Sequence, residues 1–330
     1  MTDAATIEAT ALRARRYAPD DKPVWDRFVD QAKNGVFLFR RDYMDYHASR
    51  FVDHSLLFFD GGALVVLLPA TERGDTLVSH GGLTFGGMLT DHRMRTSQMM
   101  QVFDCLKSYM RERGMSRLVY KAVPHIYHTL PAEEDLYCLH RHGARILRRD
   151  VSATVRMAER PTYSKGRKWS TKRALAQGME VGASPDFRGF MAMEEELLLK
   201  KHDSRPTHSA EEMELLANRF PDNIKLFTAT QGGAMMGGVV IYLSRRVAHT
   251  QYIGANDAGL ALGAIDAITH HLLNVVYKDL PYFDFGTCAG PDGISLNAGL
   301  MENKESYGAR AVVYDIYELA ATTPCSSCLV

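Results

Sequence analysis

A lysine and an aspartate close to the end of the chain have the chemistry to act on a carbonyl or phosphate group. Lys304 stands just before Glu-Ser-Tyr-Gly, and Asp284 lies inside the apolar run Tyr-Phe-Asp-Phe-Gly at 282–286. A lysine held beside a loop can bind a phosphate or stabilise charge that develops on a carbonyl oxygen. We therefore predict catalytic roles for Lys304 and Asp284, although the aspartate could instead bond to backbone at a strand end. Nearby Asn297 and Tyr307 are candidates for acceptor binding.

A basic segment is the second candidate. Residues 160–179 contain six basic residues and no acidic one. Three lysines share one helical face by their spacing, and we expect Trp169 and Leu175 to pack beneath them. Such a face suits the phosphates of a nucleotide-sugar, of CoA or of a tRNA acceptor end, and the alternative is a solvated face between domains. The candidate phosphate-binding residues are Lys165, Arg167, Lys168, Lys172 and Arg173.

A glycine-bearing turn at 252–264 is the third candidate, because it is expected to join a strand to a helix. Backbone N–H groups at a helix start attract anions. The predicted donor-binding residues are Gly254, Asn256, Gly259 and Gly263. The alternative is an ordinary helix start capped by Asn256 or Asp257, and the charge of Asp257 would repel a phosphate.

Two loops of the first half, 79–87 and 124–131, gather glycine, aromatic and histidine residues. The residues predicted to line an acceptor pocket there are His80, Phe85, Tyr127 and His128. These histidines could equally be structural. His125 and His128 lack a third ligand at zinc-site spacing, so no metal is predicted. No phosphate-binding loop, nucleophile elbow or His-Glu-x-x-His motif occurs, so no covalent nucleophile is predicted.

The elements that must position these residues follow one plan twice. In the first half the patterns predict helices at 24–33, 43–51, 96–113 and 131–142, and strands at 55–59, 63–70, 117–121 and 144–155. In the second half they predict helices at 164–177, 187–201, 210–218 and 260–277, and strands at 224–230, 234–244, 247–255, 282–285 and 311–319. We therefore expect an internal duplication, with mixed sheets of the α/β or α+β class.

The order of three C-terminal motifs resembles the FemAB-like branch of the GNAT acyltransferases. They are Tyr-Phe-Asp-Phe-Gly at 282–286, Leu-Asn-Ala-Gly-Leu at 296–300 and Lys-Glu-Ser-Tyr-Gly at 304–308. The resemblance covers about 24–319, although Tyr307 replaces the usual phenylalanine and the donor turn lacks the usual glycine spacing. It implies two tandem GNAT-like domains, which we place at 21–160 and 161–320, with tails at 1–20 and 321–330. It also implies that Lys304 contacts substrate, that the 252–264 turn holds the acyl donor and that the first-half loops face a cleft between the domains.

The resemblance implies an N-acyltransferase. We expect acyl-CoA as co-substrate, no tightly bound cofactor, and the amine of a small amino sugar or amino acid as acceptor. The first alternative is a Fem-like transferase that uses aminoacyl-tRNA. The region 187–220 is short for a long coiled-coil arm that would assist tRNA binding, which favours the CoA-type donor. The second alternative is a binding module without catalysis.

Composition limits the remaining possibilities. Lys plus Arg and Asp plus Glu both number 39, and this zero balance argues against a partner such as duplex DNA. No apolar run reaches the length of a membrane span, and residues 1–11 lack the apolar core of a secretory signal. Three scattered cysteines suggest reduced thiols and a cytoplasmic protein. Cys325 and Cys328 form a C-x-x-C pair without a second pair, which is expected to be part of a flexible tail.

Overall fold

The computed structural model describes residues 12–290 and 292–322, so Cys325 and Cys328 lie outside the described residues. The chain forms two compact units: Met1–Arg149 with Tyr314–Val330, and Asp150–Val313. Strand β9 (Arg145–Arg156) leads from the first unit into the second, and β15 (Arg310–Ala320) leads back. The first unit is therefore built from two stretches of sequence. The reason is that β15 pairs antiparallel with β8 (Arg117–Lys121), with Leu319 opposite Leu118.

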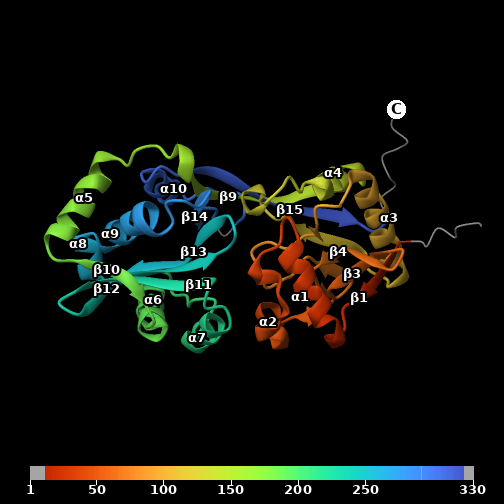
Figure 1. Ribbon diagram of the computed structural model, residues 1–330, viewed down its shortest axis with the longest axis horizontal. Coiled ribbons are helices and arrows are strands. Elements are labelled where there is room, and N and C mark those ends of the chain that lie inside the picture. The colour runs from red at the N-terminus through yellow and green to blue at the C-terminus, as the bar shows by residue number, and fades with distance from the viewer. Residues whose placement is uncertain (1–11, 291, 323–330) are drawn as a thin grey trace, which may run out of the picture. The chain divides into compact units, whose positions relative to one another are not determined.

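The first unit is a mixed α/β unit with two groups of strands (Figure 1). One has the order β1-β3-β4-β7 and the other the order β15-β8-β6-β5-β2. The strands are β1 (Arg13–Arg16), β2 (Val52–Asp53), β3 (Leu56–Asp60), β4 (Ala63–Leu68), β5 (Thr71–Arg73), β6 (Thr76–Val78) and β7 (Leu89–Thr90). The helices are α1 (Lys22–Gln31), α2 (Arg41–Met44), α3 (Thr96–Glu112) and α4 (Glu134–Arg141). The predicted hairpin is the β3–β4 pair.

Two predictions for the first unit need correction. Arg13–Arg16 is not a disordered tail, because it pairs antiparallel with β3 as an edge strand. The helix predicted at 43–51 is α2 followed by a 3₁₀ segment, Asp45–Arg50, in which His47 has non-helical dihedral angles. The core of the unit forms where the apolar face of α3, including Val102, Phe103 and Leu106, packs against the strands.

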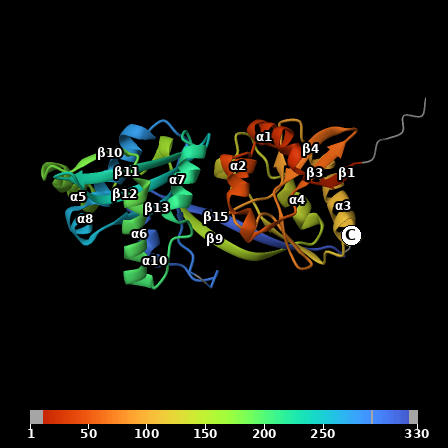
Figure 2. The same ribbon diagram turned by 90° about the horizontal axis from the view of Figure 1, so that it is seen from below.

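The second unit carries one sheet with the strand order β10-β11-β12-β13-β14-β9. Helices α5, α8 and α9 cover one face of it, and α6 and α7 cover the other (Figures 1 and 2). The strands are β10 (Glu180–Ser184), β11 (Ile224–Gln231), β12 (Ala234–Leu243), β13 (Val247–Ala255) and β14 (Tyr282–Thr287). The helices are α5 (Lys165–Ala176), α6 (Phe187–His202), α7 (Ala210–Arg219), α8 (Asp257–Leu262), α9 (Ala264–His271) and α10 (Ala298–Glu305).

The single helix predicted at 260–277 is wrong. Gly263 adopts a left-handed conformation with φ of 85°, which ends α8 and starts α9. A π-helical turn, Leu272–Val276, then replaces the end of the predicted helix. Glycine adopts positive φ without steric cost, so the break occurs at the residue best suited to it.

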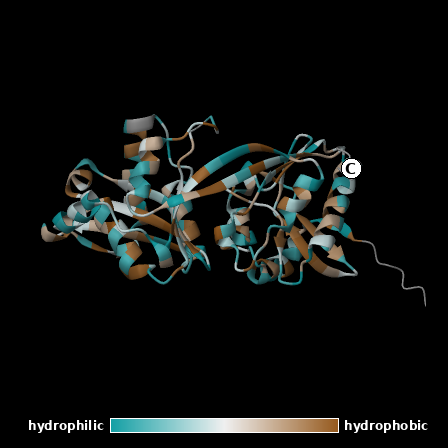
Figure 3. Ribbon diagram, turned by 90° about the horizontal axis from the view of Figure 1, so that it is seen from above, coloured by the Kyte–Doolittle hydropathy of each residue, from teal (hydrophilic) through white to brown (hydrophobic). Residues whose placement is uncertain are grey.

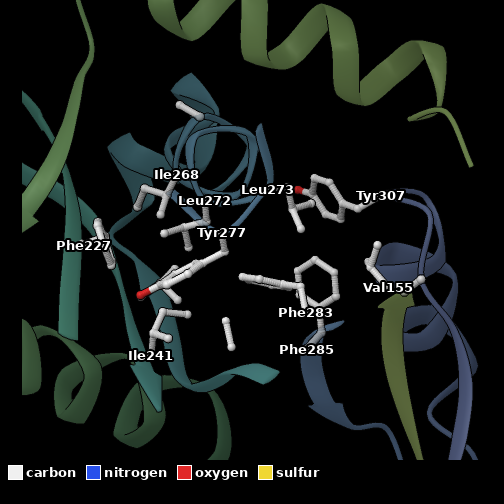
Figure 4. Packing of buried hydrophobic residues seen from close by; sticks show 14 of the residues in the cluster. Val155, Phe227, Ile241, Ile268, Leu272, Leu273, Tyr277, Phe283, Phe285 and Tyr307 are labelled. Atoms are coloured by element: carbon white, nitrogen blue, oxygen red, sulfur yellow. The ribbon is translucent and has the colours of Figure 1, made fainter. Parts of the chain in front are cut away.

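Aromatic and aliphatic side chains from α9, the π-helical turn and β14 form the core of the second unit (Figure 4). Phe283 lies edge-on to Phe285, and Phe285 stacks on Tyr307. The helices of both units carry hydrophilic as well as hydrophobic residues (Figure 3), as expected where a helix covers one face of a sheet. Among the described residues, no helix has the length and apolar character of a membrane span.

Candidate active site

The second unit has a gap in its sheet between β13 and β14. These strands run parallel and are in register over three pairs, the last of which is His249 with Asp284. Beyond that pair, β13 and β14 both line a cavity of about 590 Å³, here called the strand cavity. Its lining includes Glu194, Gly254, Phe285, Asn297, Lys304 and Tyr307. The structure thus brings one predicted donor residue together with three predicted substrate residues.

Lys304 is a buried residue of α10 that lines the strand cavity. Its Nζ atom donates to the carbonyl oxygens of Gly286 at 2.9 Å and Thr287 at 3.2 Å. Asn297 caps α10 by accepting a hydrogen bond from the Leu300 N–H, which starts the helix that carries the lysine. Burial lowers the pKa of Lys304, an effect that Cys288 and Asp284 oppose. A cation is therefore fixed at the end of β14, beside the cavity.

Tyr307 links the strand cavity to α5. Its ring stacks on Phe285, and its hydroxyl donates to the carboxylate of Asp266. The same carboxylate accepts hydrogen bonds from Ser170 Oγ at 2.6 Å and from Arg167 Nη1 at 2.9 Å. Burial and the charge of Asp266 raise the pKa of Tyr307, so the phenol stays protonated as a donor. Arg167, a predicted phosphate ligand, is therefore engaged in an ion pair that joins helices.

Asp284 is fully buried and does not line the strand cavity. Its Oδ1 atom accepts from Ser152 Oγ at 2.6 Å and from Thr154 Oγ1 at 2.7 Å. Its Oδ2 atom lies 2.7 Å from Nδ1 of His249. Burial would raise the pKa of Asp284, but the hydrogen bonds from His249, Ser152 and Thr154 lower it overall. The aspartate is thus placed to orient His249, a partly exposed residue that the sequence analysis did not select.

The four predicted donor residues have different surroundings. Gly254 lines the strand cavity, and a Cβ atom there would lie 2.1 Å from Glu194 Oε2. Asn256 caps α8 by accepting from the Gly259 N–H at 2.8 Å. A Cβ atom on Gly259 would lie 1.9 Å from the Met236 carbonyl oxygen. Gly259 and Gly263 therefore allow α8 to pack and end, while Gly254 borders the cavity.

The basic helix α5 is oriented differently from the prediction. Its buried face consists of small residues, Thr171 and Ala174. Trp169 was expected to pack beneath the lysines, as was Leu175, but their exposed fractions are 62% and 48%. The guanidinium of Arg173 lies over the Trp169 ring and donates to the Ala261 carbonyl oxygen. The predicted amphipathic pattern is therefore wrong for α5, because polar side chains and small residues make its contacts.

The predicted acceptor residues of the first half, His80, Phe85, Tyr127 and His128, are all buried within the first unit. The rings of Phe85 and Tyr127 lie 4.7 Å apart, and His128 Nε2 lies 3.0 Å from the Val123 carbonyl oxygen. Burial lowers the pKa of His80 to about 3 and that of His128 to about 4. Both rings are therefore neutral at physiological pH.

In the part of the chain that the structure describes, no group of three acidic, histidine or cysteine side chains could hold a metal ion.

Residues 160–293 match the family model of the acetyltransferase (GNAT) domain. The second unit contains a GNAT domain. The parting of β13 and β14 and the cavity beside them lie in this domain. No curated protein matches the chain in sequence.

Similarity in fold to solved structures extends over nearly the whole chain. The crystal structure of FemX matches with a TM-score of 0.63 and 10% identity, covering 92% of this chain and 96% of FemX. L-PGS from Bacillus licheniformis matches with a TM-score of 0.60 and 12% identity, covering 94% of each chain. A conserved Bacteroides thetaiotaomicron protein of unknown function matches with a TM-score of 0.58 and 11% identity, covering 93% of this chain and 98% of that one. The predicted fold is thereby confirmed: the chain has a FemX-like mixed α/β fold over nearly its whole length.

Proposed function

We propose that this protein transfers an acyl group from a thioester donor to an amine, with the reacting groups at the strand cavity. The observation that carries this proposal is the parting of β13 and β14 immediately after the His249–Asp284 pair, within a GNAT domain. A parted strand exposes backbone N–H groups that no neighbouring strand uses. Such groups on β13 can donate to the thioester carbonyl oxygen and stabilise the oxyanion that forms on attack.

His249 supplies the proton acceptor in this proposal. When Nδ1–H donates to Asp284, the other ring nitrogen, Nε2, is the basic one. The attacking amine forms a bond to the thioester carbon and loses a proton to Nε2. The C–S bond then breaks, and the leaving sulfur takes this proton from Nε2 and departs as the thiol. His249 does not line the strand cavity. It belongs to the last registered pair before β13 and β14 part, and this placement supports the role. Lys304 contributes a fixed positive charge beside the same cavity.

The donor is proposed to be an acyl-CoA. Part of the lining of the strand cavity is apolar. The apolar residues include Leu197, Leu260, Ile265 and Leu300, and Lys304 adds a cation. Cavities of this volume are typical of small-molecule sites, which usually fall at about 300–1,000 Å³. The region 187–220 holds only α6 and α7, of 16 and 10 residues, which is short for the coiled-coil arm that the FemAB-like resemblance associates with tRNA binding. An aminoacyl-tRNA donor remains the alternative, and the experiment below separates the two.

The test is a thermal-shift titration with acetyl-CoA, longer acyl-CoAs and free CoA. A donor at about 100 times its dissociation constant stabilises the fold by about 2.7 kcal/mol. A saturable shift supports an acyl-CoA donor, and a screen of amino sugars and amino acids for thiol release then identifies the acceptor. If no CoA compound stabilises the protein but a charged tRNA does, the donor is an aminoacyl-tRNA. If neither binds, the proposed transferase function is wrong.

A further inference from the structure

A second cavity of the second unit is positively charged and has no acidic side chain in its lining. Its volume is about 560 Å³, and it lies against α5 and the C-terminal end of α9. It shares no lining residue with the strand cavity. Its lining includes Arg160, Tyr163, Lys168, Lys172, Leu175 and Asn274, and it is called the basic cavity below.

The two lysines of the basic cavity are not used to hold the fold together. Lys168 and Lys172 are both exposed and lie one helical turn apart on α5. Among the described residues, no carboxylate forms a salt bridge with either of them. Like charges at this spacing destabilise a helix by about 0.2–0.5 kcal/mol. Both lysines are therefore available to a ligand, whereas Arg167 on the same helix is paired with Asp266.

The third cation, Arg160, is held in position by a hydrogen-bond network. Its guanidinium donates to the Leu273 carbonyl oxygen at 3.2 Å and to Asn274 Oδ1 at 2.6 Å. Asn274 in turn donates to the Tyr163 hydroxyl at 3.1 Å. The guanidinium carbon lies 5.0 Å from the centre of the Tyr163 ring. The charge and the aromatic ring are thus arranged before any ligand arrives, which lowers the ordering cost of binding.

The backbone beneath this network is irregular. Leu273 and Asn274 belong to the π-helical turn, and π-bulges occur frequently at functional sites. His270 also lines the cavity, and burial together with the nearby Arg160 lowers its pKa. It therefore adds a neutral polar group. Tyr163 and Leu175 supply an apolar wall, so the cavity can take more than a bare anion.

We propose that the basic cavity binds a phosphorylated ligand of nucleotide size, with Arg160, Lys168 and Lys172 holding the phosphate oxygens. The base or another flat group of the ligand would lie against Tyr163 and Leu175. Multiple cations without an acidic neighbour select a multiply charged anion such as a diphosphate. The volume lies well within the range of small-molecule sites. Two sources carry this chemistry, a free nucleoside diphosphate and the 3′ end of an RNA. The proposal does not rest on acyl transfer at the strand cavity.

Tryptophan fluorescence can report ligand binding at the basic cavity. It has two tryptophans: Trp25 is fully buried in the first unit, and Trp169 is exposed on the helix that forms one wall of the basic cavity. Trp169 lies three residues from Lys172, which places the two side chains side by side on the helix surface. Ligand binding to Lys172 should therefore change the tryptophan emission.

The experiment is a fluorescence titration of the full chain with pyrophosphate, ADP and the RNA trinucleotide CCA. We expect saturable changes with pyrophosphate and with at least one nucleotide ligand. Lys172→Ala and Lys168→Ala should each weaken binding about tenfold, which corresponds to about 1.4 kcal/mol. Lys165→Ala is the matched control, because it removes one exposed lysine of the same helix that does not line the cavity. Its affinity should equal that of the wild type.

The outcomes separate the possibilities. Tighter binding of ADP identifies a free nucleotide, and tighter binding of CCA identifies an RNA end. A response to pyrophosphate alone overturns the proposed ligand size, and no response to any of the three overturns the site. An equal loss in Lys165→Ala and Lys172→Ala means general attraction of counter-ions and also overturns it. The thermal shift with acetylpantetheine, a thioester that lacks the nucleotide part of CoA, tests the strand cavity independently of the basic cavity.

Discussion

His249 Nδ1 lies 2.7 Å from Asp284 Oδ2, and these two residues form the last registered pair before β13 and β14 part. This contact holds the imidazole beside the last registered pair, where β13 and β14 begin to part. Ser152 and Thr154 saturate the other carboxylate oxygen, so the aspartate cannot turn away from the histidine without losing hydrogen bonds. A buried, fully bonded carboxylate is a rigid support for a ring that must accept a proton.

Removal of the imidazole should slow the chemical step without preventing donor binding. General base catalysis contributes about 10²–10⁴-fold to rate, so His249→Ala should lower kcat by that factor with the acceptor found in the amine screen. The acetyl-CoA thermal shift should be unchanged. His140→Ala, which removes an exposed histidine of α4, is the control and should leave both measurements unaltered. An undiminished kcat in His249→Ala would remove His249 from the mechanism.

Asp284→Asn should reduce stability in a pH-dependent way. Charged hydrogen bonds contribute about 1.5–3 kcal/mol, and an asparagine NH₂ group cannot accept from His249 Nδ1–H. The pKa of Asp284 is lowered in the folded state from its ordinary value of 3.8. The stabilisation by Asp284 is therefore fully present above that value and is lost as the pH falls through the lower, folded-state pKa.

Urea unfolding of both proteins between neutral and acidic pH measures this difference. The difference in unfolding free energy between the wild type and Asp284→Asn should become smaller on acidification. A difference that becomes larger as the pH falls would contradict the assignment of a stabilising carboxylate. Asp292→Asn is a suitable control, since Asp292 is exposed and accepts hydrogen bonds from the backbone N–H groups of Ile294 and Ser295 in a surface turn.

More of the fold than of the candidate site could be predicted from the sequence. Strands 117–121 and 247–255 were predicted with their observed bounds, because alternating or β-branched runs between turn residues are local signals. The short strands β5 and β6 were missed, since three residues carry too little periodicity. The return of β15 into the first unit depends on its pairing with β8, which no local pattern encodes.

In the candidate site too, residues within a local motif were predicted, and residues whose roles depend on strand register were missed. Lys304 and Tyr307 were selected from a motif, and both line the strand cavity. His249 was missed because its role depends on the register of two parallel strands that are 35 residues apart in sequence at this pair. Trp169 was expected to pack beneath the lysines, because tryptophan is highly buried on average. In α5 the interior positions are instead taken by small residues and by groups that bond to Asp266.

Lys304→Met tests whether the buried cation serves the donor. Methionine keeps the unbranched apolar stem but cannot donate to the carbonyl oxygens of Gly286 and Thr287. Because burial lowers the pKa of Lys304, the charged form is held at a cost, and its loss should change the unfolding free energy by only about 0.5–1.5 kcal/mol. The acetyl-CoA thermal shift should disappear.

Glu302→Gln provides the control for Lys304→Met, because Glu302 is an exposed residue of the same helix outside the cavity lining. This variant should bind acetyl-CoA as the wild type does. A full thermal shift in Lys304→Met would show that the lysine only supports the end of β14.

Gly259→Ala tests whether α8 must pack directly on β12. The added methyl group would lie 1.9 Å from the Met236 carbonyl oxygen, a backbone atom that cannot move aside as a flexible side chain can. Overpacking of this kind costs about 1–3 kcal/mol, which lowers the melting temperature by about 2–4 °C per kcal/mol in a unit of this size.

Gly166→Ala is the matched control, since Gly166 is exposed in α5 and its nearest neighbour would be 4.0 Å away. Alanine is favoured over glycine in a helix by about 1 kcal/mol, so this variant should melt higher than the wild type. Equal melting temperatures for the two variants would mean that α8 can shift away from β12, and the glycine at 259 would then have no packing role.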